Sequence, residues 1–295
     1  MQNNRGKNIL QLHFIVFIFG FTSVLGALIS ISALPITIYR MGIASFFLAL
    51  FIFFYDKNKF KLRKGLIIKI LICGLIIALH WITFFYAIKI SNVSITVSMM
   101  SSAAFLTSLI EPLFFKKKFL LYELILGILS LFGVSIIFNA EIKYIDGLIV
   151  ALISSVLVSV FTILNSRIVI NNSSITISFY EFISGVFFIS LYIAFSNDGF
   201  DASFFKLSIN DWLYLGILAS VCTAYAFIAS VYVMRYITPY SVVLTYNLEP
   251  IYGIFLALLF FPQTEVMPPI FYIGAALIIC TVLMNALVKY KIGKI

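Results

Sequence analysis

The sequence is poor in charged and ionisable side chains. Only 11% of its 295 residues are charged, and it holds two histidines and three cysteines. A soluble domain carries roughly 25% charged residues, so a water-soluble protein is excluded. The histidines, His13 and His80, lie far apart, and no cysteine belongs to a CxxC pair, so no metal site is expected. A phosphate-binding G-x-x-x-x-G-K-[ST] motif is missing too, so neither ATP nor another cofactor is expected.

Apolar residues, which make up 63% of the chain, are arranged in runs of membrane-spanning length. A bilayer core of about 30 Å needs roughly 20 apolar residues per helix. The runs predict an all-α polytopic membrane protein with ten transmembrane helices. These are expected at 9–31, 34–55, 67–88, 93–115, 120–138, 146–166, 174–195, 211–234, 238–260 and 268–288.

The net charge of +9 comes from short basic clusters between the apolar runs, at 57–64, 116–118 and 289–294. Such clusters are typical of juxtamembrane anchors facing anionic lipid, so nucleic acid is not an expected partner. When the amino terminus is placed in the cytoplasm, roughly 16 of the 20 cations fall on the cytoplasmic side. Both termini are therefore predicted to be cytoplasmic, in the inner or plasma membrane.

The second half of the chain repeats the first. A shift of about 146 residues places Tyr86 on Tyr232 and Lys89 on Arg235, and lays 113–115 (LFF) on 259–261 (LFF). The repeat unit holds five spans, and an odd number inverts the second copy in the membrane. Two inverted five-helix repeats are a common architecture of secondary transporters.

Several stretches resemble the drug/metabolite transporter superfamily of the EamA type. They are HFIVFIFGFTSVLGALIS (13–30), YRMGIAS (39–45), LHWITFFYAIKISNVS (79–94) and LTYNLEPIYGIFLALLFF (244–261). The resemblance implies two EamA-like five-helix repeats, at 9–138 and 147–288, and a transporter. Many members end their fourth and ninth helices with a glutamate. Here Glu265 stands in the expected place after the ninth helix, but the fourth ends in Lys116–Lys118, so the first half departs from the pattern.

The leading candidate site residue is Glu249, which lies near the bilayer centre. Pro250 follows it, removes an intrahelical hydrogen bond, and is expected to kink the helix beside Tyr246 and Asn247. Intramembrane acids next to helix breaks indicate a transporter's binding site. The alternative is a carboxyl group that only locks helices together.

Two other ionisable groups lie within predicted helices. Arg40 is placed about six residues, roughly 9 Å, inside the second span. It either reaches to the headgroups and helix-end carbonyls or faces an anionic substrate. Glu181, in the seventh span, either takes part in binding or coupling or forms a structural pair with a neighbour such as Asn165.

His80 lies near the midplane of the third span, with Trp81 beside it. The imidazole is expected either to relay protons and bind substrate or to bond a backbone carbonyl on another helix. Trp81 either lines an aromatic cavity or only packs between helices. Tyr225, in the eighth span, is a further candidate for the substrate site.

Together these features predict a secondary transporter, expected to export small metabolites such as amino acids by alternating access. Its partners would be a small-molecule substrate and the lipid bilayer. If protons are the coupling ion, Glu249 is the first candidate to carry them and His80 the second; the sequence equally allows facilitated diffusion. The alternatives are a membrane-embedded enzyme and a structural membrane protein without transport activity. No nucleophile–base set or HExxH motif favours the enzyme. The oligomeric state does not follow from the sequence.

Overall fold

A computed structural model describes residues 2–196, 199–200 and 204–292, and over these residues the chain contains helices and turns but no strands. The helices are α1 Gln2–Leu28, α2 Ala33–Tyr55, α3 Ile67–Ile90, α4 Val93–Met100, α5 Ala103–Phe115, α6 Leu121–Ala140, α7 Ile145–Val169, α8 Ser174–Phe195, α9 Ile209–Ala219, α10 Ala226–Val233, α11 Pro239–Tyr246, α12 Glu249–Phe260 and α13 Pro269–Ile292. Short 3₁₀ turns at Lys57–Phe60, Lys64–Leu66 and Ile142–Tyr144 join some of them.

Nine helical segments of the described chain are long and apolar enough to cross a membrane. The tenth predicted span coincides with α13, whose apolar part over the described residues, Pro269–Thr281, is shorter. Large apolar side chains such as Phe54, Phe132 and Phe195 are exposed on the bundle, as lipid-facing positions require. The chain is therefore a multi-pass membrane protein, as predicted.

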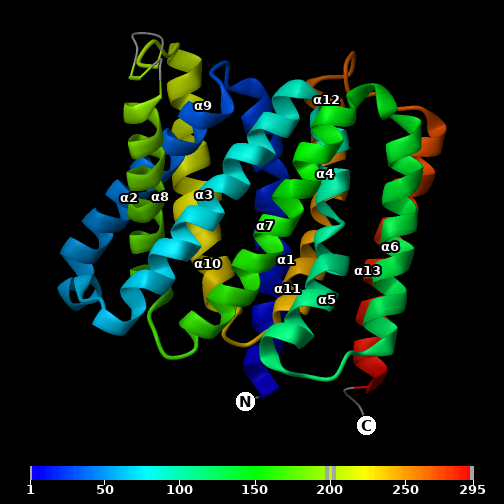
Figure 1. Cartoon of the computed structure of the whole chain (residues 1–295), viewed down its shortest axis with the longest axis horizontal. Coiled ribbons are helices and arrows are strands. Elements are labelled where there is room, and N and C mark those ends of the chain that lie inside the picture. Colours follow the sequence, from blue (N-terminus) through cyan, green and yellow to red (C-terminus); the bar gives the residue numbers. More distant parts are fainter. Residues whose placement is uncertain (1, 197–198, 201–203, 293–295) are drawn as a thin grey trace.

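The helices run back and forth along one bundle (Figure 1). The start of α1 and the last turns of α13 lie at the same end, which we call the terminal end. The opposite end, where α3 finishes and α4 begins, is called the distal end. The basic cluster at 289–294 belongs to the terminal end, but residues 293–294 lie outside the described residues.

Two of the predicted spans are broken near their middle. The fourth is interrupted at Ser101–Ser102, between α4 and α5, and the ninth at Asn247–Leu248, between α11 and α12. Both breaks are made of the same 3₁₀ turns. At the first break, Ser101 N donates to Ser98 O (3.2 Å) and Ser102 N to Met99 O (3.1 Å).

At the second break, Asn247 N donates to Leu244 O (3.1 Å) and Leu248 N to Thr245 O (3.0 Å). Each donor and each acceptor lies 146 residues after its counterpart in the first half, which is the shift that relates Tyr86 to Tyr232. The repeat is therefore visible in the backbone as well as in the sequence. Pro250 lies in the first turn of α12, so the expected kink is a full end and restart of the helix.

Helices α6 and α13 pack closely as a pair at one side of the bundle. A Cβ atom on Gly133 would lie 2.7 Å from the carbonyl oxygen of Gly274, and one on Gly274 would lie 2.7 Å from that of Gly133. Only hydrogen fits at either position, so two glycines from the two repeats set the distance between these helices.

Candidate functional site

A cavity lies at the centre of the bundle, where the two helix breaks meet α1, α2, α3, α7 and α10. Its volume is about 80 Å³, below the roughly 300–1,000 Å³ usual for ligand sites. Ala103 and Glu249, the first residues of the half-helices α5 and α12, both line it. Six of the eight predicted site residues line this cavity: Arg40, His80, Trp81, Tyr246, Asn247 and Glu249.

Arg40 is held inside the protein and does not reach the headgroups, since its side chain is only 1% exposed. Its Nε donates a hydrogen bond to Thr223 Oγ1 (2.9 Å), and its guanidinium carbon lies 3.9 Å from the centroid of the Trp81 ring. Nη1 is buried and has no hydrogen-bond partner among the described residues. The guanidinium group is thus held by the hydrogen bond from Nε and by stacking on Trp81. Nη1 remains free to bind a ligand in the cavity.

Thr223, which positions this arginine, is not among the site residues predicted from the sequence. Thr223 lies in a π-helix, Ser220–Tyr225, that joins α9 to α10, and its Oγ1 donates to Leu218 O (2.7 Å) while accepting from Arg40. Single-turn π-helices occur frequently at functional sites. The local sequence, SVCTAY, continues an apolar run and contains no Pro or Gly that would signal the irregular turn.

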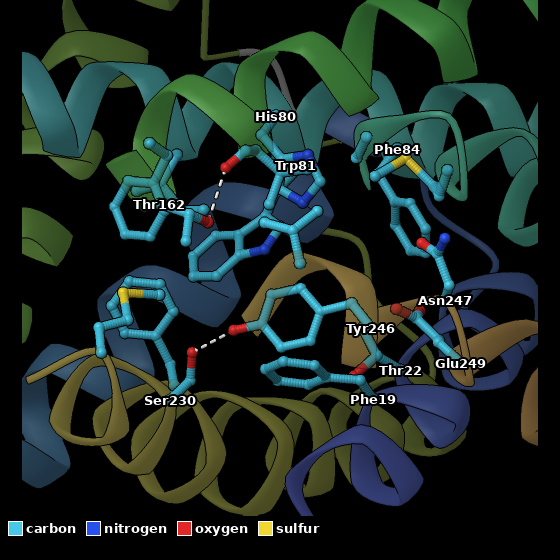
Figure 2. Close-up of a pocket in the computed structure, with 18 of the residues that line it drawn as sticks. Phe19, Thr22, His80, Trp81, Phe84, Thr162, Ser230, Tyr246, Asn247 and Glu249 are labelled. Carbon is cyan, nitrogen blue, oxygen red and sulfur yellow. Dashed lines mark hydrogen bonds between the residues drawn. The ribbon is translucent and has the colours of Figure 1, made fainter. Parts of the chain in front are cut away.

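The ninth-helix break supplies the second polar side of the cavity. Figure 2 shows Glu249 beside Asn247 at one end of the cavity, and Tyr246 reaching toward Ser230. Tyr246 Oη and Ser230 Oγ are 2.6 Å apart. Among the described residues, Asn247 Nδ2 is buried without a hydrogen-bond partner. Arg40 and Glu249 both line the cavity, but no ion pair joins them in this part of the chain.

His80 is tied to the helix beside it. Its Nδ1 lies 3.0 Å from the carbonyl oxygen of Ser154 on α7, and Ser154 Oγ donates to the His80 carbonyl oxygen (2.9 Å). Donating to a carbonyl requires a hydrogen on Nδ1, so this contact is the carbonyl bond expected of a neutral histidine. Nε2 remains as the ring nitrogen available to a ligand.

Aromatic rings form the apolar walls of the cavity. The Trp81 ring centroid lies 5.4 Å from that of Phe227, which lies 5.5 Å from that of Phe161, in tilted or edge-on contacts. All three line the cavity together with Phe19 and Phe84. Trp81 therefore both walls the cavity and supports the guanidinium of Arg40.

Two predicted site residues lie elsewhere. Glu181 on α8 is fully buried outside the cavity and accepts a hydrogen bond from Asn165 Nδ2 (2.8 Å), the structural pair that was the alternative for it. Tyr225 is 49% exposed and lines an open surface groove with Phe47 and Tyr232. It is the last residue of the π-helix, whose wider turn changes the helical face that residues here occupy.

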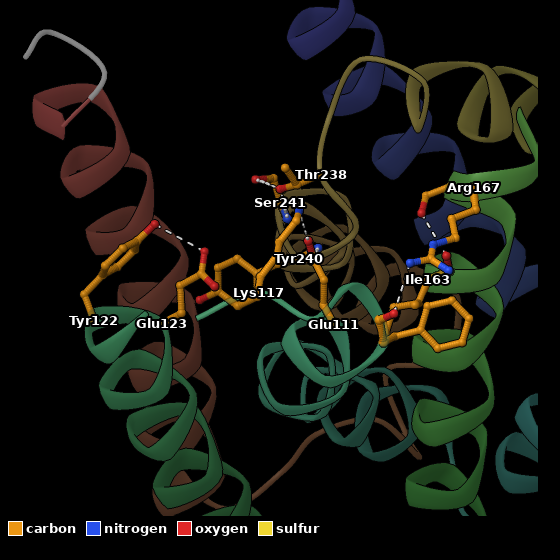
Figure 3. A network of polar contacts seen from close by, with 11 residues as sticks. Glu111, Lys117, Tyr122, Glu123, Ile163, Arg167, Thr238, Tyr240 and Ser241 are labelled. Carbon is orange, nitrogen blue, oxygen red and sulfur yellow. Dashed lines mark hydrogen bonds and ion pairs between the residues drawn. The ribbon is translucent and has the colours of Figure 1, made fainter. Parts of the chain in front are cut away.

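Carboxylates hold the broken helices at opposite ends of the bundle. At the distal end Glu265, 3% exposed, accepts hydrogen bonds from Val93 N and Ser94 N at the start of α4 (2.9 Å each). At the terminal end Glu111 accepts one from Tyr240 N at the start of α11 (2.7 Å), as Figure 3 shows. Glu111 also forms an ion pair with the basic cluster, its Oε1 lying 3.6 Å from Lys117 Nζ.

The two caps are counterparts, because Ser94 and Tyr240 differ by the 146-residue shift. Glu111 thus supplies, from within α5, the carboxylate that the family pattern places after the fourth helix. It binds one amide only, because Pro239, the counterpart of Val93, has no N–H.

Two cations also form equivalent contacts, one in each repeat. Lys89 Nζ donates to the carbonyl oxygen of Ile29 after α1. Arg235, its counterpart, donates to the carbonyl oxygens of Val169 (3.1 Å) and Asn172 (2.6 Å) after α7. Each cation lies at the carboxyl end of a neighbouring helix, where the helix dipole favours positive charge.

The distal end has one further carboxylate contact. Asp211 on α9 accepts hydrogen bonds from Ser30 N (2.6 Å) and Ser30 Oγ (2.7 Å) in the α1–α2 connection. Its counterpart in the register of the repeat is Gly65, which has no side chain to do the same. The distal end is therefore more firmly tied together than the terminal end.

The cavity's electrostatics combine a fixed cation with two helix amino termini. The half-helices α5 and α12 begin at its wall, and a helix amino terminus carries a partial positive charge that favours anions. Glu249, in the first turn of α12, adds one acidic group. No group of three or more His, Cys, Asp or Glu side chains able to hold a metal ion occurs in the described part of the chain.

Comparison with known proteins gives a family match and a structural match. The model of the EamA-like transporter family matches residues 7–139 and again residues 145–287. A protein of known crystal structure has a similar fold, with a TM-score of 0.72, 14% sequence identity, and coverage of 96% of this chain and 98% of that one. At this identity the likeness shows the fold alone. No curated protein matches the sequence.

Proposed function

We propose that this chain, which belongs to the EamA-like transporter family, is a secondary transporter. It exports small metabolites, such as amino acids or related compounds, by alternating access. The observation that carries the proposal is the central cavity and the polar groups that line it. Arg40 Nη1 and Asn247 Nδ2 are buried without a hydrogen-bond partner among the described residues, and the Glu249 carboxyl group lines the cavity beside them.

These groups suit a substrate that carries both charges. Arg40 Nη1 and the amino termini of α5 and α12 favour a carboxylate, whereas the Glu249 carboxyl group favours an ammonium group. The rings of Trp81, Phe161 and Phe227 favour an apolar side chain beside the charged groups. An amino acid or a related zwitterion satisfies all three features.

The repeat supports alternating access. The cavity lies where the two breaks meet, and the capped starts of α4 and α11 lie at opposite ends of the bundle. Releasing the Glu265 contacts would free the distal end, and releasing the Glu111 contact would free the terminal end. Two pseudo-symmetric halves can then move against each other around one central site.

For the membrane topology, we propose ten spans in the inner or plasma membrane, with the terminal end in the cytoplasm. The basic clusters at 57–64 and 116–118 lie between helices that meet at that end, which agrees with the rule that cations remain inside. A reporter fused at Lys294 is expected to report cytoplasm. A periplasmic signal there would overturn the ten-span topology.

Counterflow in proteoliposomes tests the transport activity directly. The purified protein is reconstituted, loaded with one unlabelled compound from a metabolite panel rich in amino acids, and supplied with the labelled form outside. Transient accumulation of at least one compound is expected, because exchange through a central site needs no energy source. Failure with every compound, together with turnover of a lipid-linked substrate, would favour the membrane-embedded enzyme instead.

A further inference from the structure

A second polar site lies next to the cavity but is closed off from it. Glu181 on α8 and Asn165 on α7 are both 0% exposed, and Asn165 Nδ2 donates to Glu181 Oε1 at 2.8 Å. Ser178 lies one turn before Glu181 on the same face of α8 and is also fully buried. These three side chains are polar groups that the central cavity does not use.

Three oxygen atoms of this site have no hydrogen-bond partner among the described residues. They are Glu181 Oε2, Asn165 Oδ1 and Ser178 Oγ. Ionised carboxylate and amide oxygens only accept hydrogen bonds, so the first two need a donor that the site lacks. A charged carboxylate in the membrane interior also costs a few kcal/mol unless it is paired or hydrated.

No cation on the helices packed against α8 neutralises Glu181. Arg40 on α2 is bonded to Thr223, Lys89 on α3 to Ile29, and Arg167 on α7 to Phe114 O. Lys69 on α3 is exposed, and Lys59 in the 3₁₀ turn before α3 lies 3.7 Å from Asp56. The titratable group that faces Glu181 from α3 is the buried thiol of Cys73.

We propose that Glu181 carries a proton in this conformation, and that the Glu181–Asn165 pair is the site at which the transporter binds the proton that drives it. A hydrogen on Oε2 removes the charge and provides the missing donor, which Asn165 Oδ1 accepts. A buried water could serve the oxygens but would leave the charge in place. The proposal rests on the transport function proposed above and adds its coupling ion.

The pair is connected to the cavity wall through its immediate neighbours. Phe182, next to Glu181, has its ring centroid 5.9 Å from that of Trp81 and 4.9 Å from that of Phe227. Thr162, one turn before Asn165 on α7, lines the cavity. Loss of the proton creates a charge that must be hydrated, so α7 and α8 must separate. This separation moves α7, which lines the substrate site, and Phe182, which packs against the lining residues Trp81 and Phe227.

Infrared difference spectroscopy tests the protonation with protons and deuterons as the only probes. The spectrum of the reconstituted wild-type protein minus that of Glu181→Gln is expected to contain the carbonyl stretch of a protonated carboxyl group, shifted in D₂O. Asn165→Leu should move this band to higher frequency, because the hydrogen bond to Oε1 is lost. Glu265→Gln is the matched control, since Glu265 accepts two amide hydrogens and should contribute no such band.

A difference spectrum with carboxylate bands and no protonated carbonyl band would overturn the proposal. The same holds for a band that neither D₂O nor Asn165→Leu moves. A band that instead appears only when sodium is removed would identify a sodium site. These readouts need no transported compound, so they remain informative if the transport function fails.

Accumulation in proteoliposomes tests the coupling. For a compound that shows counterflow, a gradient of about one pH unit should drive up to about tenfold accumulation if one proton moves per molecule. In Glu181→Gln accumulation should fall to the equilibrium level, while counterflow without a gradient persists. Gradient-driven accumulation that survives in Glu181→Gln would refute coupling through this pair without touching the transport function.

Discussion

Replacing Arg40 by lysine tests whether the cavity recognises a carboxylate through the free Nη1. Lysine keeps the positive charge, but it cannot stack on Trp81 and bond Thr223 while still presenting a further donor. Thr223 Oγ1 retains its bond to Leu218 O (2.7 Å), so the π-helix and the fold should persist. The effect should therefore fall on the substrate.

The expected size follows from a single contact. A hydrogen bond to a charged group contributes about 1.5–3 kcal/mol. Its loss should therefore raise the half-saturating substrate concentration roughly 10- to 150-fold. The loss should be confined to compounds with a free carboxylate. An amino-acid amide, which lacks this charge, should be affected much less.

Counterflow of an amino acid and of its amide, measured in parallel for the parent and Arg40→Lys, gives this comparison. Arg235→Lys is the control, because Arg235 bonds backbone carbonyls outside the cavity. An equal change for both compounds, or no change for either, would refute the assignment of Nη1 to a substrate carboxylate.

Three further predictions concern other sites of the bundle. Glu249→Gln should abolish or uncouple transport and leave membrane insertion intact, because Glu249 is the one acidic residue among the described residues that line the cavity. Transport equal to that of the parent would contradict this role. Glu265→Gln should lower the free energy of unfolding by about 1–3 kcal/mol, since a neutral amide oxygen cannot replace a carboxylate that accepts two amides; thermal unfolding of the purified protein measures it, and an unchanged midpoint would show that the cap adds no stability. Gly133→Ala should lower the free energy of unfolding by about 1–3 kcal/mol, because the added Cβ forces α6 away from α13. Gly42→Ala, whose Cβ would meet nothing within 4 Å, should instead raise it by up to about 1 kcal/mol. Equal melting temperatures for the two alanine variants would refute the packing argument.

The sequence was sufficient for the helical class, the multi-pass character and the family. Runs of apolar residues are local features of the sequence. Repeated positions, such as Tyr86 and Tyr232, are related by one constant shift. The family match confirms the identification as an EamA-type protein. The ten-span topology and the cytoplasmic termini stay predictions.

The sequence could not predict features that depend on tertiary contacts. The break at Ser101–Ser102 occurs in an apolar run without a proline at the break, unlike the one before Pro250. Thr223 meets Arg40 across 183 positions of the chain, and no local pattern indicates such a pair. The shared capping role of Glu111 and Glu265 was likewise hidden, because the two acids occupy different places in their repeats.

The broken fourth helix also bears on how the protein enters the membrane. Helix α4 has eight residues, which at about 1.5 Å per residue span only roughly 12 Å of a bilayer core of about 30 Å. Neither half could be inserted as a separate segment, since its open end would be left in lipid with unbonded backbone groups. The nascent segment must leave the insertion machinery as one continuous helix, Val93–Phe115. It can break only after later helices have arrived to shelter Ser101 and Ser102, above all α7, whose Ser155 Oγ lies 2.7 Å from Ser102 Oγ, so the site is completed late in biogenesis.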